Sequence, residues 1–394
     1  MTMTTDNLNP LLKKLGTESA FTVLSRAASL AESGKDIINL GIGQPDFRTP
    51  DFIVESAIKA LRDGHHGYTT AKGIPQLREA VANDFKIQNS HELNSEQILI
   101  VPGGKVTMAF AMLLLGGLGN EILYPDPGFP IYGSMARFSG ATAKPYSLSA
   151  ENGFGISADE VLDKVTHKTR LLILNSPANP TGGINSVDEL KKLATGLESY
   201  PNIYILSDEI YSRLYFDGMS HFSPISLPEL SDRTIILDGW SKTYAMTGWR
   251  LGWSYWPKNL IDYAERLAIN IHSCVNAPTQ WAGLAALTGP QIHVKEMCEA
   301  FSFRRRLVLN ALDKMQCVTA PLPKGAFYAF PEFKLADLNG EDIQNLLLEE
   351  VGVATVAGSS FGDSSATSIR LSFANSNERI IEALDRISHW LDSR

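Results

Sequence analysis

Residues 203–211 read IYILSDEIY, in which a run of apolar and aromatic residues ends at a serine and two acids. Short runs of this kind, rich in β-branched and aromatic side chains, are typical of strands buried on both faces of a parallel sheet. We predict a strand at 203–206, and similar runs predict others at 98–101, 122–124, 171–174 and 234–237. The sequence therefore predicts an α/β fold with a mostly parallel sheet and right-handed crossovers.

Helices are predicted between these strands from capping residues and from apolar residues at helical spacing. Ser186 and Glu189 have the spacing of a capping box, and Thr49 is predicted to cap a helix with Pro50 in its first turn. After about residue 290 the pattern changes to mixed helices and strands, which predicts a smaller α+β domain. Its expected elements are a helix to about 315, a strand at 327–330, a helix at 342–351, a strand at 368–373 and a last helix from about 376.

Length and charge limit the class of protein. The chain has 394 residues, enough for two domains or one large domain with a smaller one. Its net charge of -8 provides no basic field for nucleic acid or an anionic membrane. The basic triplet at 304–306 lies in the long predicted helix and is interpreted as a solvated helix face.

Cysteines and apolar runs bear on the location of the protein. The three cysteines form no C-x-x-C pair, so we expect neither a disulfide framework nor a metal site. Residues 1–9 are polar and lack the apolar core of a secretion signal, and the longest apolar run, at 108–115, is too short to span a bilayer. We therefore expect a cytoplasmic protein.

Chemically distinctive side chains follow each predicted strand, where an open α/β sheet binds its ligands. Two glycines and a lysine follow the first strand, and an aromatic ring follows the second. An amide follows the third, a carboxylate and a phenol follow the fourth, and a lysine and a guanidinium follow the fifth. In chain order these residues are Gly103, Gly104, Lys105, Phe129, Asn179, Asp208, Tyr211, Lys242 and Arg250. We expect them to meet in one cleft.

Part of this set suits a phosphate. Gly103 and Gly104 allow the backbone to approach an anion at the start of a helix, where N–H groups are unpaired. Arg250 can add a charge-assisted contact to the same phosphate.

The rest suits a phosphorylated aromatic aldehyde. Lys242 can form a Schiff base with the aldehyde. Asp208 can keep a pyridine nitrogen protonated, so that the ring accepts electrons. Tyr211 and Asn179 can hydrogen-bond a phenolic oxygen on the ring, and Phe129 can lie flat against it.

Four motifs together identify a family resemblance. They are N-P-T-G at 179–182, S-D-E-I-Y at 207–211, S-K-T-Y-A-M-T-G-W-R at 241–250 and R-L-S-F at 370–373. From about Ile38 to its end the chain resembles the class I/II aminotransferases of fold type I, which use pyridoxal 5'-phosphate (PLP), in the subgroup similar to aspartate aminotransferases.

The resemblance implies an architecture as well as a cofactor. It implies a homodimer with its active site at the subunit interface. A large PLP-binding domain at 43–288 and a small α+β domain built from both chain ends, at 1–42 and 289–394, are expected.

The resemblance also implies roles for individual residues. Lys242 carries the cofactor and shuttles the proton, with Asp208 and Tyr211 as the other catalytic residues. Arg370 binds the substrate α-carboxylate, and Tyr68 reaches the phosphate of the partner subunit. The implied cofactor contacts are Gly103, Gly104, Lys105, Phe129, Asn179, Asp208, Tyr211, Ser241, Lys242, Arg250 and Tyr68, and the implied substrate contacts are Gly43, Asn179, Arg370 and Lys105.

Two positions depart from the family pattern. Many members have a serine or threonine that contacts the phosphate three residues before the lysine, where this chain has Gly239. The residue stacked on the ring is often tryptophan or tyrosine and is here Phe129, which cannot donate a hydrogen bond.

Lys105 has two open interpretations. In one subgroup of aspartate aminotransferases a lysine after the phosphate-loop glycines faces the distal carboxylate of the substrate. A cation in the first turn of a helix is also opposed by the helix dipole and calls for a compensating anion. The alternative is that Lys105 points to solvent or pairs with a nearby acid.

The function expected from these observations is aminotransfer between an L-amino acid, such as aspartate or glutamate, and a 2-oxo acid such as 2-oxoglutarate. One alternative is a PLP-dependent lyase acting on a β- or γ-substituted amino acid, because it would use the same lysine and arginine. A second is a non-catalytic PLP-binding regulator, but regulators of this family carry a DNA-binding module before the fold, and little chain precedes Ile38.

Overall fold

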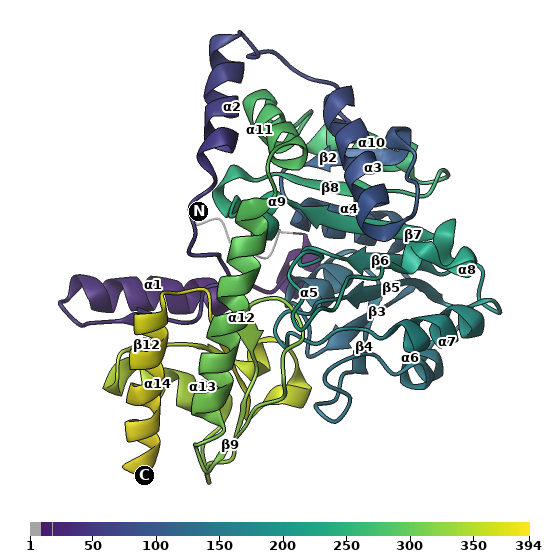
Figure 1. Ribbon diagram of the computed structural model, residues 1–394. Coiled ribbons are helices and arrows are strands. Elements are labelled where there is room, and N and C mark those ends of the chain that lie inside the picture. Colours follow the sequence, from purple (N-terminus) through teal and green to yellow (C-terminus); the bar gives the residue numbers. More distant parts are fainter. Residues whose placement is uncertain (1–8, 18) are drawn as a thin grey trace, which may run out of the picture.

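The computed structural model describes residues 9–17 and 19–394. Of the polar N-terminal segment considered above, residues 1–8 lie outside this range. Within it, the largest sheet has the strand order β2-β8-β7-β6-β5-β3-β4 (Figure 1). Its strands are β2 (Ile98–Val101), β3 (Glu121–Asp126), β4 (Thr142–Ser147), β5 (Thr169–Asn175), β6 (Tyr204–Asp208), β7 (Thr234–Gly239) and β8 (Gly252–Tyr255).

The strands from β7 to β4 run parallel to one another, and β8 runs antiparallel to both of its neighbours, β2 and β7. The predicted α/β fold with a mostly parallel sheet is confirmed. All five predicted strands are present. Two further strands, β4 and β8, were not predicted.

Helices cover both faces of this sheet, because alternate residues of each strand point to opposite sides. Leu99 and Val101 of β2 pack in one apolar cluster with residues of α4, α5 and α10, whereas Ile98 and Ile100 pack in another with α3 and α11. Helices α6, α7 and α8 extend this second face over β5 and β6. The bounds are α3 (Pro75–Asn89), α4 (Lys105–Leu115), α5 (Ile131–Phe138), α6 (Ala158–Lys164), α7 (Val187–Leu197), α8 (Pro228–Ser231), α10 (Ile261–Ile271) and α11 (Ala277–Thr288).

Two further helices complete this part of the molecule. Helix α2 (Asp51–Arg62) packs on α11 at the upper edge of Figure 1. Helix α9 (Trp240–Thr243) follows β7 directly and carries Lys242.

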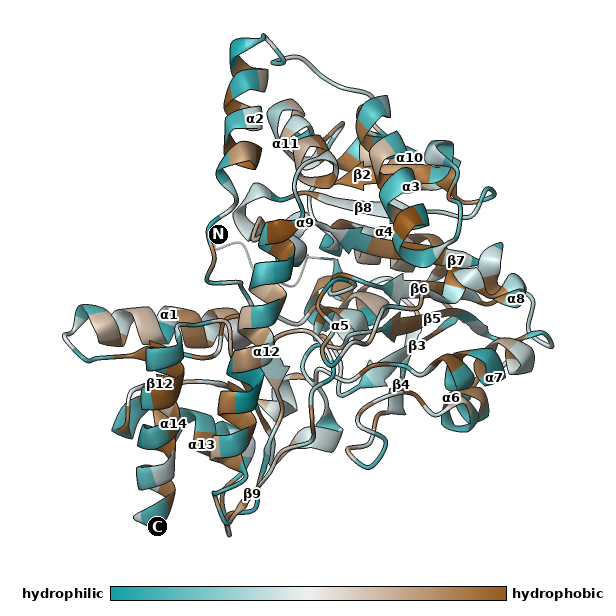
Figure 2. Ribbon diagram, in the orientation of Figure 1, coloured by the Kyte–Doolittle hydropathy of each residue, from teal (hydrophilic) through white to brown (hydrophobic). Residues whose placement is uncertain are grey.

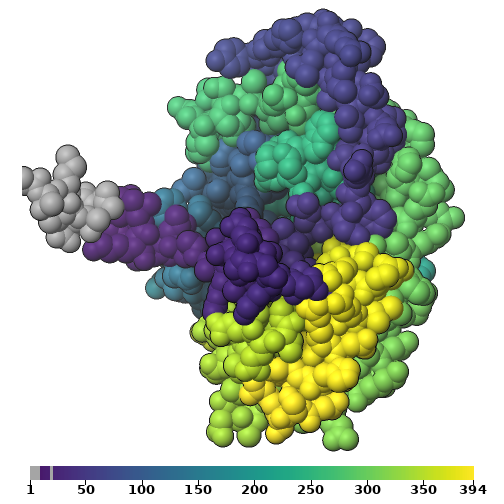
Figure 3. All heavy atoms as spheres, turned by 90° about the vertical axis from the view of Figure 1, so that its left-hand side faces the viewer, coloured from purple at the N-terminus to yellow at the C-terminus, as the bar shows by residue number. Residues whose placement is uncertain are grey.

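A second group of elements joins the two ends of the chain. Strand β1 (Ile38–Asn39) pairs in parallel with β12 (Val353–Ala354), and β14 (Ile369–Ser372) lies between β10 (Tyr328–Ala329) and β13 (Val356–Ala357). The other members are β9 (Val318–Thr319), β11 (Glu332–Phe333), α1 (Ser19–Glu32), α12 (Ile292–Leu312), α13 (Gly340–Glu350) and α14 (Asn377–Asp392). In Figure 3 the purple N-terminal segment lies against the yellow C-terminal residues.

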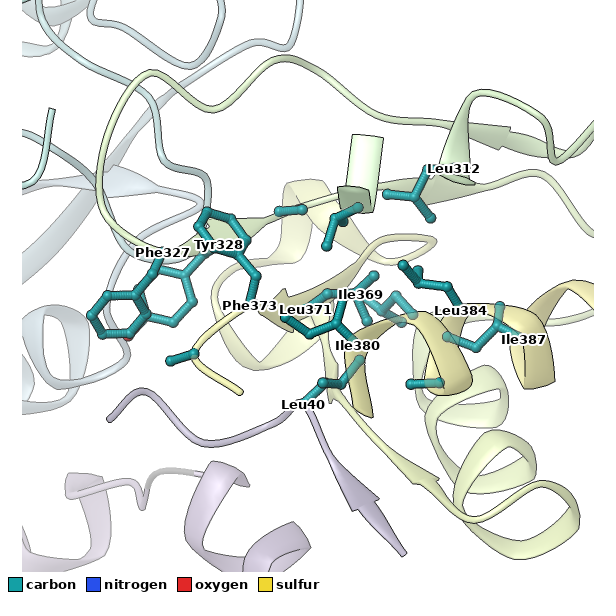
Figure 4. Packing of buried hydrophobic residues seen from close by; sticks show 14 of the residues in the cluster. Leu40, Leu312, Phe327, Tyr328, Ile369, Leu371, Phe373, Ile380, Leu384 and Ile387 are labelled. Atoms are coloured by element: carbon teal, nitrogen blue, oxygen red, sulfur yellow. The ribbon is translucent and has the colours of Figure 1, made fainter. Parts of the chain in front are cut away.

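This group has its own apolar core. Leu40, from the N-terminal segment, packs there with Leu312 of α12, Ile369 of β14 and Leu384 of α14 (Figure 4). Helices α12 and α14 each show a hydrophobic side and a hydrophilic side in Figure 2. The mixed helices and strands predicted after residue 290 are therefore present, with bounds that differ by a few residues.

Three local predictions are corrected by the structure. The capping box is half formed: the Ser186 hydroxyl accepts from the Glu189 N–H, but the Glu189 carboxylate accepts from Ala158 N–H instead. The helix after Thr49 has Pro50 at its N-cap, and the Thr49 hydroxyl donates to the Ala245 carbonyl rather than capping it.

The basic triplet is not a solvated helix face. Arg304 and Arg305 are buried and make paired hydrogen bonds to the carboxylates of Asp46 and Asp217, whereas Arg306 is exposed. Because Asp46 and Asp217 lie far from α12 in sequence, these ion pairs tie the helix to distant segments.

Candidate active site

A cavity of about 540 Å³ lies at the carboxyl ends of the parallel strands. Eleven of the predicted site residues line it: Gly43, Gly104, Lys105, Phe129, Asn179, Asp208, Tyr211, Ser241, Lys242, Arg250 and Arg370. They come from seven separate stretches of the chain: five follow strands of the large sheet, whereas Gly43 follows β1 and Arg370 lies on β14.

Gly103 and Gly104 form a tight corner before α4. Gly103 has a φ of +90°, and a Cβ atom there would lie 2.2 Å from Nη2 of Arg250. A Cβ on Gly104 would lie 2.8 Å from Cδ2 of Leu237. The positive φ favours glycine at 103, and a side chain at 104 would require Leu237 to move. The corner brings the N-terminus of α4 and the Arg250 guanidinium together.

Asp208 ends β6 and is 2 % exposed. The Tyr132 hydroxyl donates to its Oδ2 at 2.6 Å, and the Ile210 N–H donates to its Oδ1 at 3.3 Å. Burial raises the pKa of the Asp208 carboxyl to about 6, and these two hydrogen bonds oppose that rise. Burial also raises the pKa of Tyr132, so its phenol stays protonated and able to donate.

Lys242 projects into the same cavity from α9. Its Nζ donates to the Gly43 carbonyl and lies 5.9 Å from the centre of the Phe327 ring. A Cβ on Gly43 would lie 2.2 Å from the hydroxyl of Tyr328, so the backbone at Gly43 closely approaches the site.

Arg370, on β14, reaches the cavity between two aromatic rings. The centre of its guanidinium lies 4.6 Å from the Tyr328 ring and 4.9 Å from the Phe361 ring. Its Nη1 donates to Asn179 Oδ1 at 2.8 Å, and Nη2 donates to the Gly41 carbonyl. Its Nε is buried without a hydrogen-bond partner among the described residues. An unsatisfied buried donor is costly, and because Arg370 lines the cavity, an acceptor on a bound ligand would fit here.

Tyr211 follows β6, lines the same cavity and contacts Tyr328. Its hydroxyl is 2.8 Å from that of Tyr328, and the two rings meet edge to face. Burial raises the pKa of Tyr211 well above its ordinary value, so it is a neutral phenol.

Lys105 begins α4 at the mouth of the cavity. Its Nζ lies 5.3 Å from the centre of the Phe129 ring and 5.5 Å from that of Phe21, which belongs to α1. Both rings line the cavity, so the lysine is held at an aromatic wall.

Three residues that support this geometry were not predicted from the sequence: Tyr132, Tyr328 and Asn175. The Asn175 side chain donates to the Asp208 carbonyl at 3.0 Å and accepts from the Asn179 N–H at 3.0 Å, so it links two segments of the site. Asn175 directly follows a predicted strand, and that position was a usable signal. Tyr328 had no comparable signal.

Two predicted site residues lie apart from the cavity lining. Gly103 lies against the Arg250 guanidinium but does not itself line the cavity. Tyr68 is 94 % exposed, in the segment between α2 and α3.

The sequence profile of the aminotransferase class I and II family matches residues 35–387. The chain belongs to that family. It is 36% identical over 392 residues to a probable aspartate/prephenate aminotransferase of Rhizobium leguminosarum bv. phaseoli, covering 96% of this chain and 97% of that one.

Solved structures of this family share the fold. The aspartate aminotransferase from Thermus thermophilus with maleate superposes with a TM-score of 0.92 at 32% identity, covering 97% of this chain and 99% of that one. An alanine aminotransferase from Pyrococcus furiosus superposes with a TM-score of 0.93 at 30% identity, covering 98% of this chain and all of the other. The protein is therefore an aminotransferase.

Class I/II aminotransferases generally use PLP, and the cavity fits such a group. The glycine corner and Arg250 suit a phosphate, the buried Asp208 suits a ring nitrogen, and the unsatisfied Nε of Arg370 suits a carboxylate. A Cβ at Gly239 would lie 2.8 Å from the Gly252 Cα, so the serine or threonine of other class I/II aminotransferases does not fit here without movement of β8.

Other ligand classes find less support in the described residues. No group of His, Cys, Asp and Glu side chains among them could hold a metal ion. No helix within the same residues is long and apolar enough to cross a membrane.

Proposed function

We propose that this aminotransferase uses PLP to move an amino group between a dicarboxylic amino acid, aspartate or glutamate, and a 2-oxo acid such as 2-oxoglutarate. One observation carries the proposal: Lys242, Asp208 and Arg370, from three distant segments, line a single cavity. When bound, PLP supplies an aldehyde carbon that reacts with amines and a pyridine ring that withdraws electrons from it.

In this proposal each residue acts at a stated atom. Lys242 takes and returns the proton of the substrate Cα, and Asp208 holds a proton on the ring nitrogen. Tyr211 donates to the phenolic oxygen of the ring. Arg370, with Asn179 beside it, binds and orients the substrate α-carboxylate.

The test is a panel of amino acids given one at a time to the PLP-loaded enzyme, without an oxo acid. Each accepted donor should yield one oxo acid per active site and then stop, and addition of 2-oxoglutarate should restart turnover. Continuous release of ammonia from any donor would contradict aminotransfer as the main reaction.

Asp208→Asn should leave the fold intact and slow the chemical step by on the order of 10²-fold, because a neutral amide no longer holds the ring proton. That corresponds to about 3 kcal/mol for a preorganised polar group. PLP affinity of the wild type should also fall as the pH drops through about 6, where the Asp208 carboxylate gains a proton. Titrations of PLP binding against pH should show this component in the wild type and not in the variant.

A suitable control is Asp238→Asn. Burial also raises the pKa of the Asp238 carboxyl, but that carboxyl accepts hydrogen bonds from the Ser212 hydroxyl and the Gly239 N–H and does not line the cavity. The chemical step of this variant should change far less. An Asp208→Asn enzyme with full PLP occupancy and an unchanged rate would show that Asp208 faces some other group.

Substrate choice is proposed to depend on Lys105. Its place at the cavity mouth suits a distal carboxylate, and the Thermus relative was solved with maleate, a dicarboxylate. Lys105→Met should weaken aspartate and glutamate by roughly 10-fold or more while sparing alanine, since it removes one partly exposed ion pair. Steady-state kcat/KM for both kinds of donor checks this. Equal losses for alanine and glutamate would count against the proposal.

We further propose a homodimer in which Tyr68 of each subunit completes the other's phosphate site. The exposure of this large ring, 94 %, supports a partner contact. Tyr68→Ala and Lys242→Ala chains, each weakly active alone, should regain activity when refolded together, because one hybrid site then has both native residues. Sedimentation should show an active dimer. An active monomer, or no recovery in the mixture, would contradict this arrangement.

We also propose a division of the chain into two domains. A small domain of 1–42 and 289–394, apart from a large domain of 43–288, is supported by the apolar core that joins Ile38 and Leu40 to the C-terminal elements.

A further inference from the structure

A buried polar cluster lies behind the candidate active site, on the opposite side of the chain from the cavity. Its centre is Glu209, which directly follows Asp208 and is 1 % exposed. Asp208 lines the cavity, while the Glu209 side chain turns the other way, toward the loop that leads to β7. The Glu209 N–H donates to the Leu237 carbonyl at 2.8 Å, which fixes this turn to β7.

Both carboxylate oxygens of Glu209 have short partners. His221 Nε2 lies 2.6 Å from Oε2, and the Ser223 hydroxyl donates to Oε1 at 2.6 Å. The His221 side chain is 7 % exposed, so the pair is enclosed by protein. The other ring nitrogen of His221 lies 3.0 Å from the Tyr215 hydroxyl, which can accept a second N–H.

Three acidic side chains are buried close together at this end of the sheet: Asp208, Glu209 and Asp238. Burial is the main reason that the pKa values of Asp208, Asp238 and Tyr215 are raised, and the charge on Glu209 adds to each rise. Each aspartate has its own cation nearby, Lys242 for Asp208 and Arg213 for Asp238. The cation that faces Glu209 is His221, if its ring carries two protons.

A buried carboxylate without a counter-charge is costly, and its field acts on neighbouring groups at low dielectric. We propose that His221 is a positioning residue for the reaction: as an imidazolium paired with Glu209, it balances that charge and lets Asp208 stay ionised toward the cavity. This inference rests on the role of Asp208 given under the proposed function.

The cluster also has a geometric consequence. The Tyr215 hydroxyl lies 3.5 Å from that of Ser176, which accepts from the Asn185 N–H, and Tyr215 forms an isolated antiparallel bridge with Gly325. The pair of Glu209 and His221 is thus connected to the loop after β5 and to the segment before Tyr328. A change in the net charge of the Glu209 and His221 pair therefore acts on Asp208 from the side away from the cavity and adds no group to the cavity.

The first measurement is independent of turnover. In ring-¹⁵N-histidine-labelled full-length protein at pH 7, with and without PLP, both ring nitrogens of His221 should show the signature of a bonded proton, one facing Glu209 and one facing the Tyr215 hydroxyl. Its signal is assigned by its absence from His221→Gln. In Glu209→Gln, whose amide keeps the side-chain shape, one of the two ring nitrogens should lose its proton at the same pH. A neutral His221 at pH 7 in the wild type would overturn the proposal.

The second measurement is the pH profile of kcat/KM. In His221→Gln the pH at which kcat/KM falls on the acid side should rise by on the order of one pH unit. The reason is that the Glu209 charge then acts on Asp208 without a compensating cation. In Glu209→Gln that pH should move down. The double variant carries neither charge and should return toward the wild type, which a purely structural role for His221 does not predict. His167→Gln, at an exposed histidine, is the control and should leave the profile unchanged.

The outcomes separate this inference from the proposed function. If Asp208→Asn has a normal rate, the role of Asp208 fails whatever the state of His221. If Asp208→Asn is slow but the double variant keeps the shifted limb, the charge-balance inference fails alone. If His221→Gln does not fold, the pH profile of Glu209→Gln decides the question, since its low-pH limb should still move down.

Discussion

Replacing Lys242 with alanine should abolish transamination while leaving a folded protein that still binds PLP without a covalent bond. The residue lines the cavity from α9, and in this proposal it carries the cofactor and moves the substrate Cα proton. Loss of a positioned proton-transfer group alone costs 10²- to 10⁴-fold, so we expect a fall in kcat of roughly 10⁴-fold or more.

The measurement combines turnover with mass spectrometry after borohydride reduction. Wild-type protein should carry the reduced cofactor on the peptide that contains Lys242, and the variant should carry none. Lys258→Ala, at an exposed lysine outside the cavity, is the matched control and should be labelled and active like the wild type. Near-normal turnover of Lys242→Ala would contradict the role proposed for Lys242.

Much of the site could be predicted because it depends on strand ends. Asp208, Asn179 and Lys242 each follow a short apolar run, and parallel strands bring such positions to one edge of a sheet. Arg370 was placed by family resemblance alone, since no strand-end argument connects the C-terminal segment to the cavity.

The remaining parts depend on contacts between segments that are distant in sequence. Tyr132 is an ordinary helix residue until the fold sets its hydroxyl 2.6 Å from Asp208. Arg304 and Arg305 read as a solvated face because their partners, Asp46 and Asp217, lie far away in the chain. Pairing of buried charges is a tertiary property, and helical periodicity carries no information about it.

The two strands of the large sheet that were not predicted have local reasons. Strand β4 lies at the edge of the sheet, has mostly exposed or half-buried residues and contains Pro145, all of which weaken the pattern of a buried strand. Strand β8 has only four residues and begins with Gly252, whose Cβ would lie 2.8 Å from the Gly104 nitrogen. The close approach of the two backbones favours glycine at this position, and glycine is not typical of strands, so the sequence pattern of a strand is weak here.

Replacing Arg370 with alanine should lower kcat/KM for every amino acid by similar factors, because all substrates share the α-carboxylate. Removing one partner of a buried, hydrogen-bonded charge pair costs roughly 3–5 kcal/mol, or on the order of 10² to 10⁴-fold. The buried Nε without a partner and the fixed position of the guanidinium between Tyr328 and Phe361 are the features that prepare it for a planar carboxylate.

The comparison that decides the role is between Arg370→Ala and Arg370→Lys, each measured with alanine, aspartate and glutamate. Lysine keeps the charge but loses the planar fork and its stacking between two rings, so it should recover only part of the loss. The loss in Arg370→Ala should be the same for alanine as for aspartate, in contrast to the selective loss expected for Lys105→Met. If instead only the acidic donors were affected, Arg370 would be reading the substrate side chain, and the α-carboxylate would have to bind elsewhere in the cavity.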